Sequence, residues 1–216
     1  MKTTLLLVFV MFLFTSCDWL DFGKKSEDSN SIGGSTNISV NTVGNTFSPS
    51  VKIGGVSYAG GSSATITKIE DGVATINVKS KLPANVAQIV GAGAKDASGN
   101  LNYDLKVKMT DEGILDYTNK DQKPLVLVRY DASVGDKYTL DKSDGTTITR
   151  EVVSKSTTDD YFWGGMLIKT INVQQDSRIP GIKKIEYIAN HKFGLVGIKV
   201  YMEDGTTSQI DLFSAK

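Results

Sequence analysis

The chain has 216 residues, of which 40% are hydrophobic and 8% aromatic, and its 24 basic side chains balance 24 acidic ones. This balance argues against nucleic acid or an acidic polymer as a partner, because phosphate binding needs a concentrated basic face. One cysteine and one histidine exclude a disulfide framework and argue against a zinc site.

The N-terminus carries the strongest pattern in the sequence. Lys2 precedes an apolar run, 5–14, and small residues follow before Cys17. This order is typical of a secretory signal, and the run is too short for a membrane-spanning helix. The stretch Phe14-Thr15-Ser16-Cys17 resembles the lipobox of bacterial lipoproteins, with phenylalanine where leucine is usual. The resemblance implies that residues 1–16 are removed and that Cys17 receives fatty acyl chains such as palmitate on its sulfur and its amine.

Acylation would tie the mature chain to a membrane. Each buried methylene contributes about 0.8 kcal/mol, so two or more acyl chains hold a protein stably on a bilayer. Asp18 and Asp21 follow the cysteine closely. In enteric bacteria an acidic residue directly after the cysteine retains the protein at the inner membrane, but acidic residues here resemble the surface-export signal of Bacteroidota-type lipoproteins more. The resemblance implies a cell-envelope protein at the outer membrane, on its periplasmic or its surface face.

The composition divides the mature chain into two parts. Residues 17–36 are rich in Ser, Gly, Lys, Asp and Asn, which predicts a flexible tether behind the lipid. Residues 37–216 contain no strong linker and predict a single domain, with a weaker candidate boundary near 81–83. The mature chain carries 23 basic and 24 acidic residues, which again favours a solvated surface over a polyanion-binding one.

Most of the domain alternates apolar and polar residues, as half-buried strands do. Several of these segments are joined by Asp-Gly or Glu-Gly turns, in which glycine supplies a positive φ without steric cost. The predicted hairpins are 64–79 around Glu70-Asp71-Gly72, 105–117 around 110–113, 196–212 around 203–205, and a fourth with its turn at Asp144-Gly145. This spacing predicts an all-β fold built as an antiparallel meander.

Two segments depart from the alternation. Residues 125–128 are apolar at every position, which predicts a central strand covered on both faces. Residues 83–90 begin with a proline and predict a short helix at most.

From about Tyr103 to the C-terminus, the order of features resembles a family of uncharacterised bacterial periplasmic and lipid-anchored proteins. The matching stretches are Val134-Gly135-Asp136-Lys137-Tyr138, Gly164-Gly165 before a long strand, and Phe193-Gly194-Leu195-Val196-Gly197 before the last hairpin. The resemblance implies a meander that curls into a half-barrel or open barrel, with an open sandwich as the alternative. It implies no catalytic residues.

Catalytic arrangements are weakly represented. A Ser-His-acid triad would have to use His191, which lies in a loop-like stretch, and the segment 55–60 departs from a nucleophile elbow. The loop 96–104 offers oxygen atoms at every second position but lacks the glycine and the closing acidic residue of a calcium loop. The sequence therefore predicts a protein that is not an enzyme and that holds no metal or cofactor.

The aromatic cluster Tyr161-Phe162-Trp163 is the candidate for ligand or partner binding. Three consecutive aromatics cannot all face one side of a strand, and exposed aromatics are enriched at binding hot spots. Tyr161 and Trp163 are the predicted contact residues. The alternative is that Phe162 packs inward while Tyr161 and Trp163 flank it along a hairpin edge.

Three functions are consistent with these patterns. The first is a non-catalytic binding or assembly protein that engages a protein partner. The second is a carrier of a lipid or another apolar ligand, which requires a contiguous apolar pocket of roughly several hundred Å³ with a mouth. The third, a glycan-binding or glycan-hydrolysing protein, would use the aromatic cluster and the adjacent Asp159-Asp160.

Overall fold

A computed structural model describes residues 30–53, 55–58, 61–81, 94–177 and 181–214. Within these ranges the protein is all-β, as predicted, with one 13-stranded antiparallel sheet and a separate two-stranded hairpin. Among the described residues, no helix has the length and hydrophobicity that crossing a bilayer requires. The helix predicted at 83–90 lies outside the described residues. The boundary predicted near 81–83 lies outside them too, except for residue 81.

The strands alternate with short connections. In chain order they are β1 (Thr46–Ile53), β2 (Val56–Tyr58), β3 (Ser63–Glu70), β4 (Val73–Ser80), β5 (Leu101–Met109), β6 (Gly113–Asp116), β7 (Leu125–Arg129), β8 (Lys137–Asp141), β9 (Thr147–Lys155), β10 (Tyr161–Trp163), β11 (Met166–Ile168), β12 (Ile171–Asp176), β13 (Ile182–Asn190), β14 (Gly194–Met202) and β15 (Thr207–Ser214).

The four hairpins predicted from Asp-Gly and Glu-Gly turns are all present, as β3–β4, β5–β6, β8–β9 and β14–β15. In the β3–β4 turn, Asp71 and Gly72 have φ values of 50° and 79°, the pair of positive angles that a tight hairpin turn with this sequence adopts. Strands β1, β3 and β4 pair into the same sheet as the rest, so residues 46–80 and the C-terminal half form one unit.

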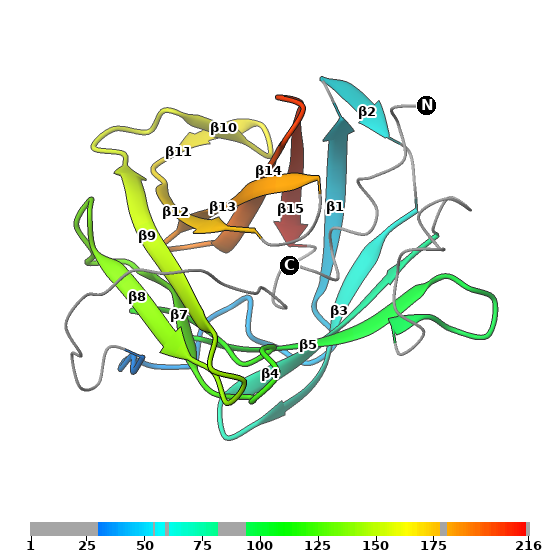
Figure 1. Cartoon of the computed structure of the whole chain (residues 1–216), viewed down its shortest axis with the longest axis horizontal. Coiled ribbons are helices and arrows are strands. Elements are labelled where there is room, and N and C mark those ends of the chain that lie inside the picture. Colours follow the sequence, from blue (N-terminus) through cyan, green and yellow to red (C-terminus); the bar gives the residue numbers. More distant parts are fainter. Residues whose placement is uncertain (1–29, 54, 59–60, 82–93, 178–180, 215–216) are drawn as a thin grey trace.

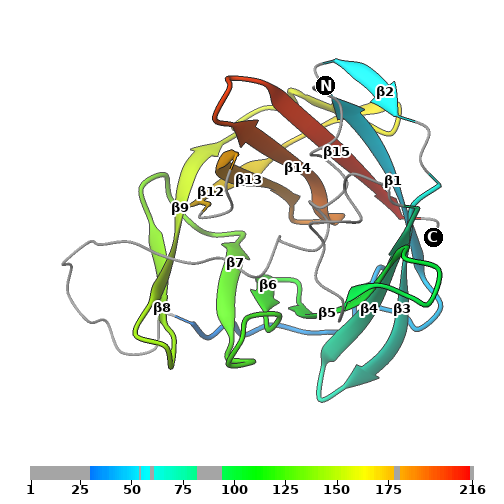
Figure 2. The same ribbon diagram turned by 45° about the vertical axis from the view of Figure 1, so that its right-hand side comes forward.

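The main sheet curls into an open barrel, as the sequence resemblance implied (Figures 1 and 2). Its strand order is β7-β6-β5-β4-β3-β1-β15-β14-β13-β12-β9-β8, with β2 attached to the side of β1. The first and last strands of this path, β7 and β8, contact each other but share no ladder of hydrogen bonds. The barrel therefore has one seam.

One strand prediction is partly wrong. Residues 125–128 are buried at every position, as predicted, but β7 is an end strand and not a central one. Its coverage comes from the barrel core on one face and from the N-terminal segment outside, where Ile32 packs against the core cluster beside Gly113 of β6. Continuous hydrophobicity reports burial on two faces, and here a segment distant in sequence supplies the second cover.

Asn30 joins the two sides of the seam. Its side-chain amide donates to the carbonyl of Thr139 on β8 at 2.7 Å and accepts from the backbone N–H of Val126 on β7 at 3.3 Å. Arg129 also donates to the carbonyl of Ser31 at 2.5 Å. The last residues of the predicted tether, 30–36, therefore lie against the barrel, while residues 17–29 lie outside the described part of the chain.

Arg150 crosses the seam from inside the barrel. From β9, its guanidinium donates to the carbonyl of Val126 at 3.2 Å, to the carboxylate of Asp116 at 2.7 Å and to the side chain of Gln175 at 2.8 Å. Arg150 and Asp116 are each 1% exposed, and the guanidinium carbon lies 5.2 Å from the centre of the Tyr187 ring. The cation is thus neutralised and hydrogen-bonded, which burial of a charge requires.

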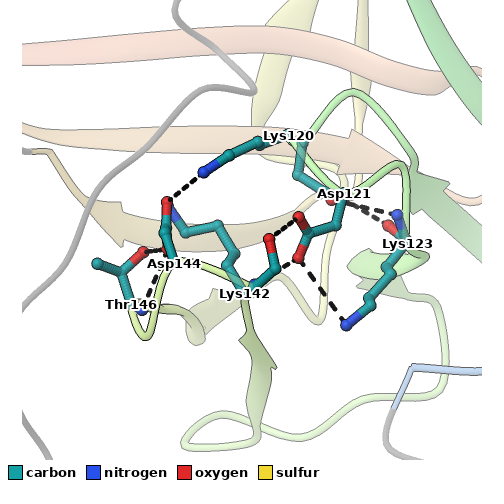
Figure 3. A network of polar contacts seen from close by, with 8 residues as sticks. Lys120, Asp121, Lys123, Lys142, Asp144 and Thr146 are labelled. Atoms are coloured by element: carbon teal, nitrogen blue, oxygen red, sulfur yellow. Dashed lines mark hydrogen bonds and ion pairs between the residues drawn. The ribbon is translucent and has the colours of Figure 1, made fainter.

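A polar cluster joins the loops at one end of the seam (Figure 3). Asp121, in the β6–β7 loop, accepts hydrogen bonds from the backbone and hydroxyl of Ser143, in the β8–β9 turn, at 2.6 and 2.5 Å. Lys120 lies 3.5 Å from Asp144 of the same turn. The Ser143 hydrogen bonds lower the pKa of Asp121, and the Thr146 hydroxyl lowers the pKa of Asp144 to about 2. Asp144 therefore stays ionised, and holds its contacts, well below pH 4, and the pKa of Asp121 shifts in the same direction.

We predict that Arg150→Met destabilises the protein by about 3–5 kcal/mol, because Asp116 is then left buried without its counter-charge. The double variant Arg150→Met/Asp116→Leu should recover much of this loss, since no unpaired charge remains. Urea unfolding of the two single variants and the double variant measures the coupling.

The matched control is Glu151→Gln, on the same strand as Arg150. It breaks the exposed ion pair between Lys137 and Glu151 and should lower the free energy of unfolding by no more than about 1 kcal/mol. A single Arg150 variant as stable as this control would contradict the prediction.

Candidate functional site

An apolar cavity of about 100 Å³ lies inside the open barrel. It is lined by residues of β3 to β7 and of β14, β15 and β1. The lining is almost entirely hydrocarbon, and its residues are Phe47, Pro49, Ser62, Ser63, Ala64, Ile76, Val78, Leu105, Val107, Met109, Ile114, Leu127, Phe193, Leu195, Ile198, Ile210 and Leu212.

The cavity has a buried floor and a half-exposed mouth. Floor residues such as Leu127, Ile114 and Ile198 are at most 2% exposed. The mouth is formed by lining residues that solvent partly reaches, and these are Phe47, Pro49, Ala64, Ile76, Phe193, Leu195 and Leu212. The volume is smaller than the several hundred Å³ that the carrier hypothesis required. A site of this size takes a slender apolar group, since an engineered cavity of about 150 Å³ in another protein holds benzene.

Serine hydroxyls stand at the rim of the mouth. Ser62 and Ser63 line the cavity at the start of β3, and the hydroxyl of Ser62 lies 2.7 Å from that of Ser80 at the end of β4. These groups offer hydrogen bonds beside an otherwise apolar interior. The arrangement suits a ligand with an apolar end inside and a polar end at the rim.

The buried polar network does not reach this cavity. Arg150, Asp116 and Gln175 are absent from the lining and lie on the β6–β9–β12 side of the interior. Burial raises the pKa of Tyr187 to about 12, so its hydroxyl stays neutral beside the guanidinium. The interior thus holds a buried polar cluster around Arg150 and a separate apolar cavity, whose lining includes Leu127 of the seam strand β7.

The aromatic cluster forms β10, which pairs with β11 in the separate hairpin outside the main sheet (Figure 1). Trp163 is 8% exposed and packs on Phe193 and Phe213, with ring centroids 4.7 and 5.5 Å away. Its indole N–H donates to the carbonyl of Leu212 at 3.0 Å. This residue fixes the hairpin to the end of β15 and to the start of β14.

Tyr161 fixes the other end of β10. Its hydroxyl donates to the carboxylate of Asp211 at 2.9 Å and accepts from the side chain of Gln209 at 3.0 Å. Burial and the neighbouring Asp211 raise the pKa of Tyr161, which keeps the hydroxyl a donor. Gly197 gives the ring its room, because a Cβ there would stand 3.0 Å from the Tyr161 hydroxyl.

The predicted orientation of the cluster is therefore reversed. Tyr161 and Trp163 face the barrel, and Phe162 is 71% exposed, because successive residues of a strand point to opposite faces. The three aromatics do not share one face, as expected, but the outward one is Phe162 and not the predicted contact residues Tyr161 and Trp163. The indole is covered and cannot stack on a sugar ring, so a glycan site at Trp163 has no structural support. Binding by this segment stays a prediction, with Phe162 as its exposed residue.

The remaining candidates lie apart from the cavity. His191 is exposed in the β13–β14 turn, as expected of a loop histidine, and Asp159 and Asp160 are exposed before β10. Asp96 accepts from the backbone of Ser98 and of Asn100 at 2.8 and 3.0 Å. It closes its own turn in the calcium-like stretch. Within the described ranges, no three His, Cys, Asp or Glu side chains are grouped so as to hold a metal ion.

Comparison with known proteins gives a fold neighbour and no sequence relative. No protein-family model matches the chain, and no curated protein matches it significantly. Among solved structures it is similar to a Bacteroides fragilis protein described as exported and of YmcC-like fold. The two share 11% identity over 81% of this chain and 97% of that one, with a TM-score of 0.46. Acylation of Cys17 stays a prediction.

The carrier hypothesis expected an apolar pocket in the curved sheet, but the sequence did not identify its lining. The lining residues are ordinary inward positions of eight strands, and alternation predicts only that they face the interior.

We predict that Trp163→Ala loosens the β10–β11 hairpin, because the indole stacks on Phe193 and Phe213 and bonds to Leu212. The free energy of local opening should fall by about 3 kcal/mol, measured by amide hydrogen exchange across the hairpin. Phe162→Ala is the matched control on the same strand and should leave exchange nearly unchanged. Equal exchange in the two variants would contradict the role assigned to Trp163.

Proposed function

We propose that the protein is a lipid-anchored, non-catalytic binding protein of the cell envelope that holds an apolar ligand in the cavity of its open barrel. The observation that carries this proposal is the cavity of about 100 Å³, whose lining is hydrocarbon and whose mouth is half-exposed. Apolar surface left unfilled in a core forfeits packing energy, so a ligand of matching shape stabilises the protein.

The shape and chemistry of the cavity limit the ligand. The space accepts the end of a hydrocarbon chain or a small ring, and Ser62 and Ser63 at the rim can bond to an attached polar group. The lining contains no charged side chain, and Arg150 is already paired with Asp116. A fatty acyl chain with its headgroup at the mouth satisfies these conditions best.

The location follows from the N-terminus. A lipobox-like stretch ending at Cys17 supports anchoring in a membrane outside the cytoplasm, at the outer membrane on its periplasmic or its surface face. Acyl chains and other apolar molecules are abundant next to such an anchor. The proposed site and the proposed anchor therefore agree in the class of ligand available.

We predict that Ala64→Leu weakens ligand binding about tenfold or more, because the added carbons occupy the cavity beside the mouth. The probe is lauric acid, titrated by calorimetry into the mature chain with Cys17→Ser. Filling the space should leave stability unchanged or raised in the absence of ligand.

Ala97→Leu adds the same bulk on an exposed turn and should bind the probe like the wild type. Probe binding that is absent from the wild type, or equal in both variants, would remove the cavity as the site.

For the anchor, we predict that the protein isolated from bacterial membranes begins at Cys17 and carries acyl chains on it. Cys17→Ser should release the exported protein from the membrane fraction, since the variant lacks the acyl chains whose methylene groups are buried in the bilayer. Mass spectrometry of the N-terminal peptide is the measurement. An unmodified thiol on exported protein would contradict the prediction.

A further inference from the structure

The outward face of the β10–β11 hairpin is apolar. Phe162 and Leu167 are 71% and 57% exposed and stand directly opposite each other across the two strands, and Met166, opposite Trp163 at the turn, is 48% exposed. Scattered single apolar residues are ordinary on a protein surface. Three on one hairpin of two three-residue strands form a patch, which we call the hairpin patch.

The hairpin patch stands on a fixed support. The inward side of the same hairpin is buried in its own apolar cluster, in which Trp163 and Ile168 pack on Ile188 and Val196 of the barrel wall. Hydrogen bonds from Trp163 and Tyr161 hold both ends of β10. The exposure of the outward side chains is therefore built into the fold by strand alternation.

The hairpin patch lies beside the mouth of the cavity. Trp163 stacks on Phe193, whose ring lines the cavity, and its indole bonds to Leu212, which lines the cavity as well. A single layer of side chains thus separates the hairpin from the mouth. A flat surface that covered the hairpin patch would also stand next to the entrance.

The anchor can bring a membrane to this place. The described chain starts at Asn30, which is bonded to the seam, and the site of acylation, Cys17, lies thirteen residues before it. A fully extended stretch of thirteen residues reaches about 45 Å. This length lets the barrel turn the hairpin patch toward the bilayer that holds Cys17.

We propose that the hairpin patch docks on the phospholipid bilayer and places the cavity mouth at its surface, where an acyl chain passes between membrane and cavity. This inference rests on the proposed function for the acyl chain, but the docking step stands on the hairpin alone. Phe162 and Leu167 would enter the headgroup layer, as the apolar face of an interfacial element does. Charges of both signs flank the hairpin, Lys169 and Lys192 against Asp159 and Asp160, so anionic lipid is not required.

The test is flotation of the mature chain, residues 17–216 with Cys17→Ser, with phosphatidylcholine vesicles. Phe162→Ser/Leu167→Ser should lower the bound fraction about tenfold or more, because two large apolar side chains no longer leave water. The matched control is Val43→Ser/Val134→Ser, since these valines are 54% and 61% exposed elsewhere on the surface, and it should bind like the wild type.

Equal flotation of the two double variants, or no flotation of the wild type, would overturn docking. Self-association that the hairpin variant abolishes in the absence of lipid would overturn it too, by showing a second copy on the hairpin patch. Titration with lauric acid separates the two proposals. The hairpin variant should keep probe binding while losing vesicles, and Ala64→Leu should do the reverse.

Discussion

The fold depends on how a twelve-strand path is made to end where it began. A sheet of this length twists, and its terminal strands would expose unpaired backbone groups if they did not meet. Here they meet without a ladder, and side chains replace the missing bonds: Asn30 serves as an added peptide group from outside and Arg150 reaches Val126 from inside. Closing the sheet in this way thus requires burying the Arg150–Asp116 ion pair.

This mode of closure organises the interior. The guanidinium is paired with Asp116, hydrogen-bonded to Gln175 and packed against the ring of Tyr187, and these residues gather at the seam. The cavity lining is apolar apart from Ser62 and Ser63, and its side chains do not fill the space. Small residues at the mouth, Ala64 and the neighbouring serines, leave the space open from one end. The curvature of the main sheet thus produces both the polar contacts at the seam and the apolar cavity.

Local chemistry made the strands and turns predictable. Alternation located most strands and Asp-Gly turns located four hairpins, because both depend on neighbours within a few residues. The placement of β7 failed, since the cover from Ile32 comes from far away in sequence. The orientation of Tyr161, Phe162 and Trp163 depended on which face the barrel would offer, which alternation leaves open by one residue. The lining and volume of the cavity could not be predicted, because an unfilled space depends on how closely many side chains distant in sequence pack together.

The attachment of Asn30 to both end strands has a mechanical consequence. Within the described chain, a force applied along the polypeptide from an acylated N-terminus reaches the side-chain amide of Asn30, which joins β7 to β8, before it reaches any ladder of paired strands. Two hydrogen bonds to one side chain yield more readily than a row of paired backbone groups. Tension on the N-terminal segment would therefore separate β7 from β8 along the seam, while the hairpins away from the seam keep their strand register.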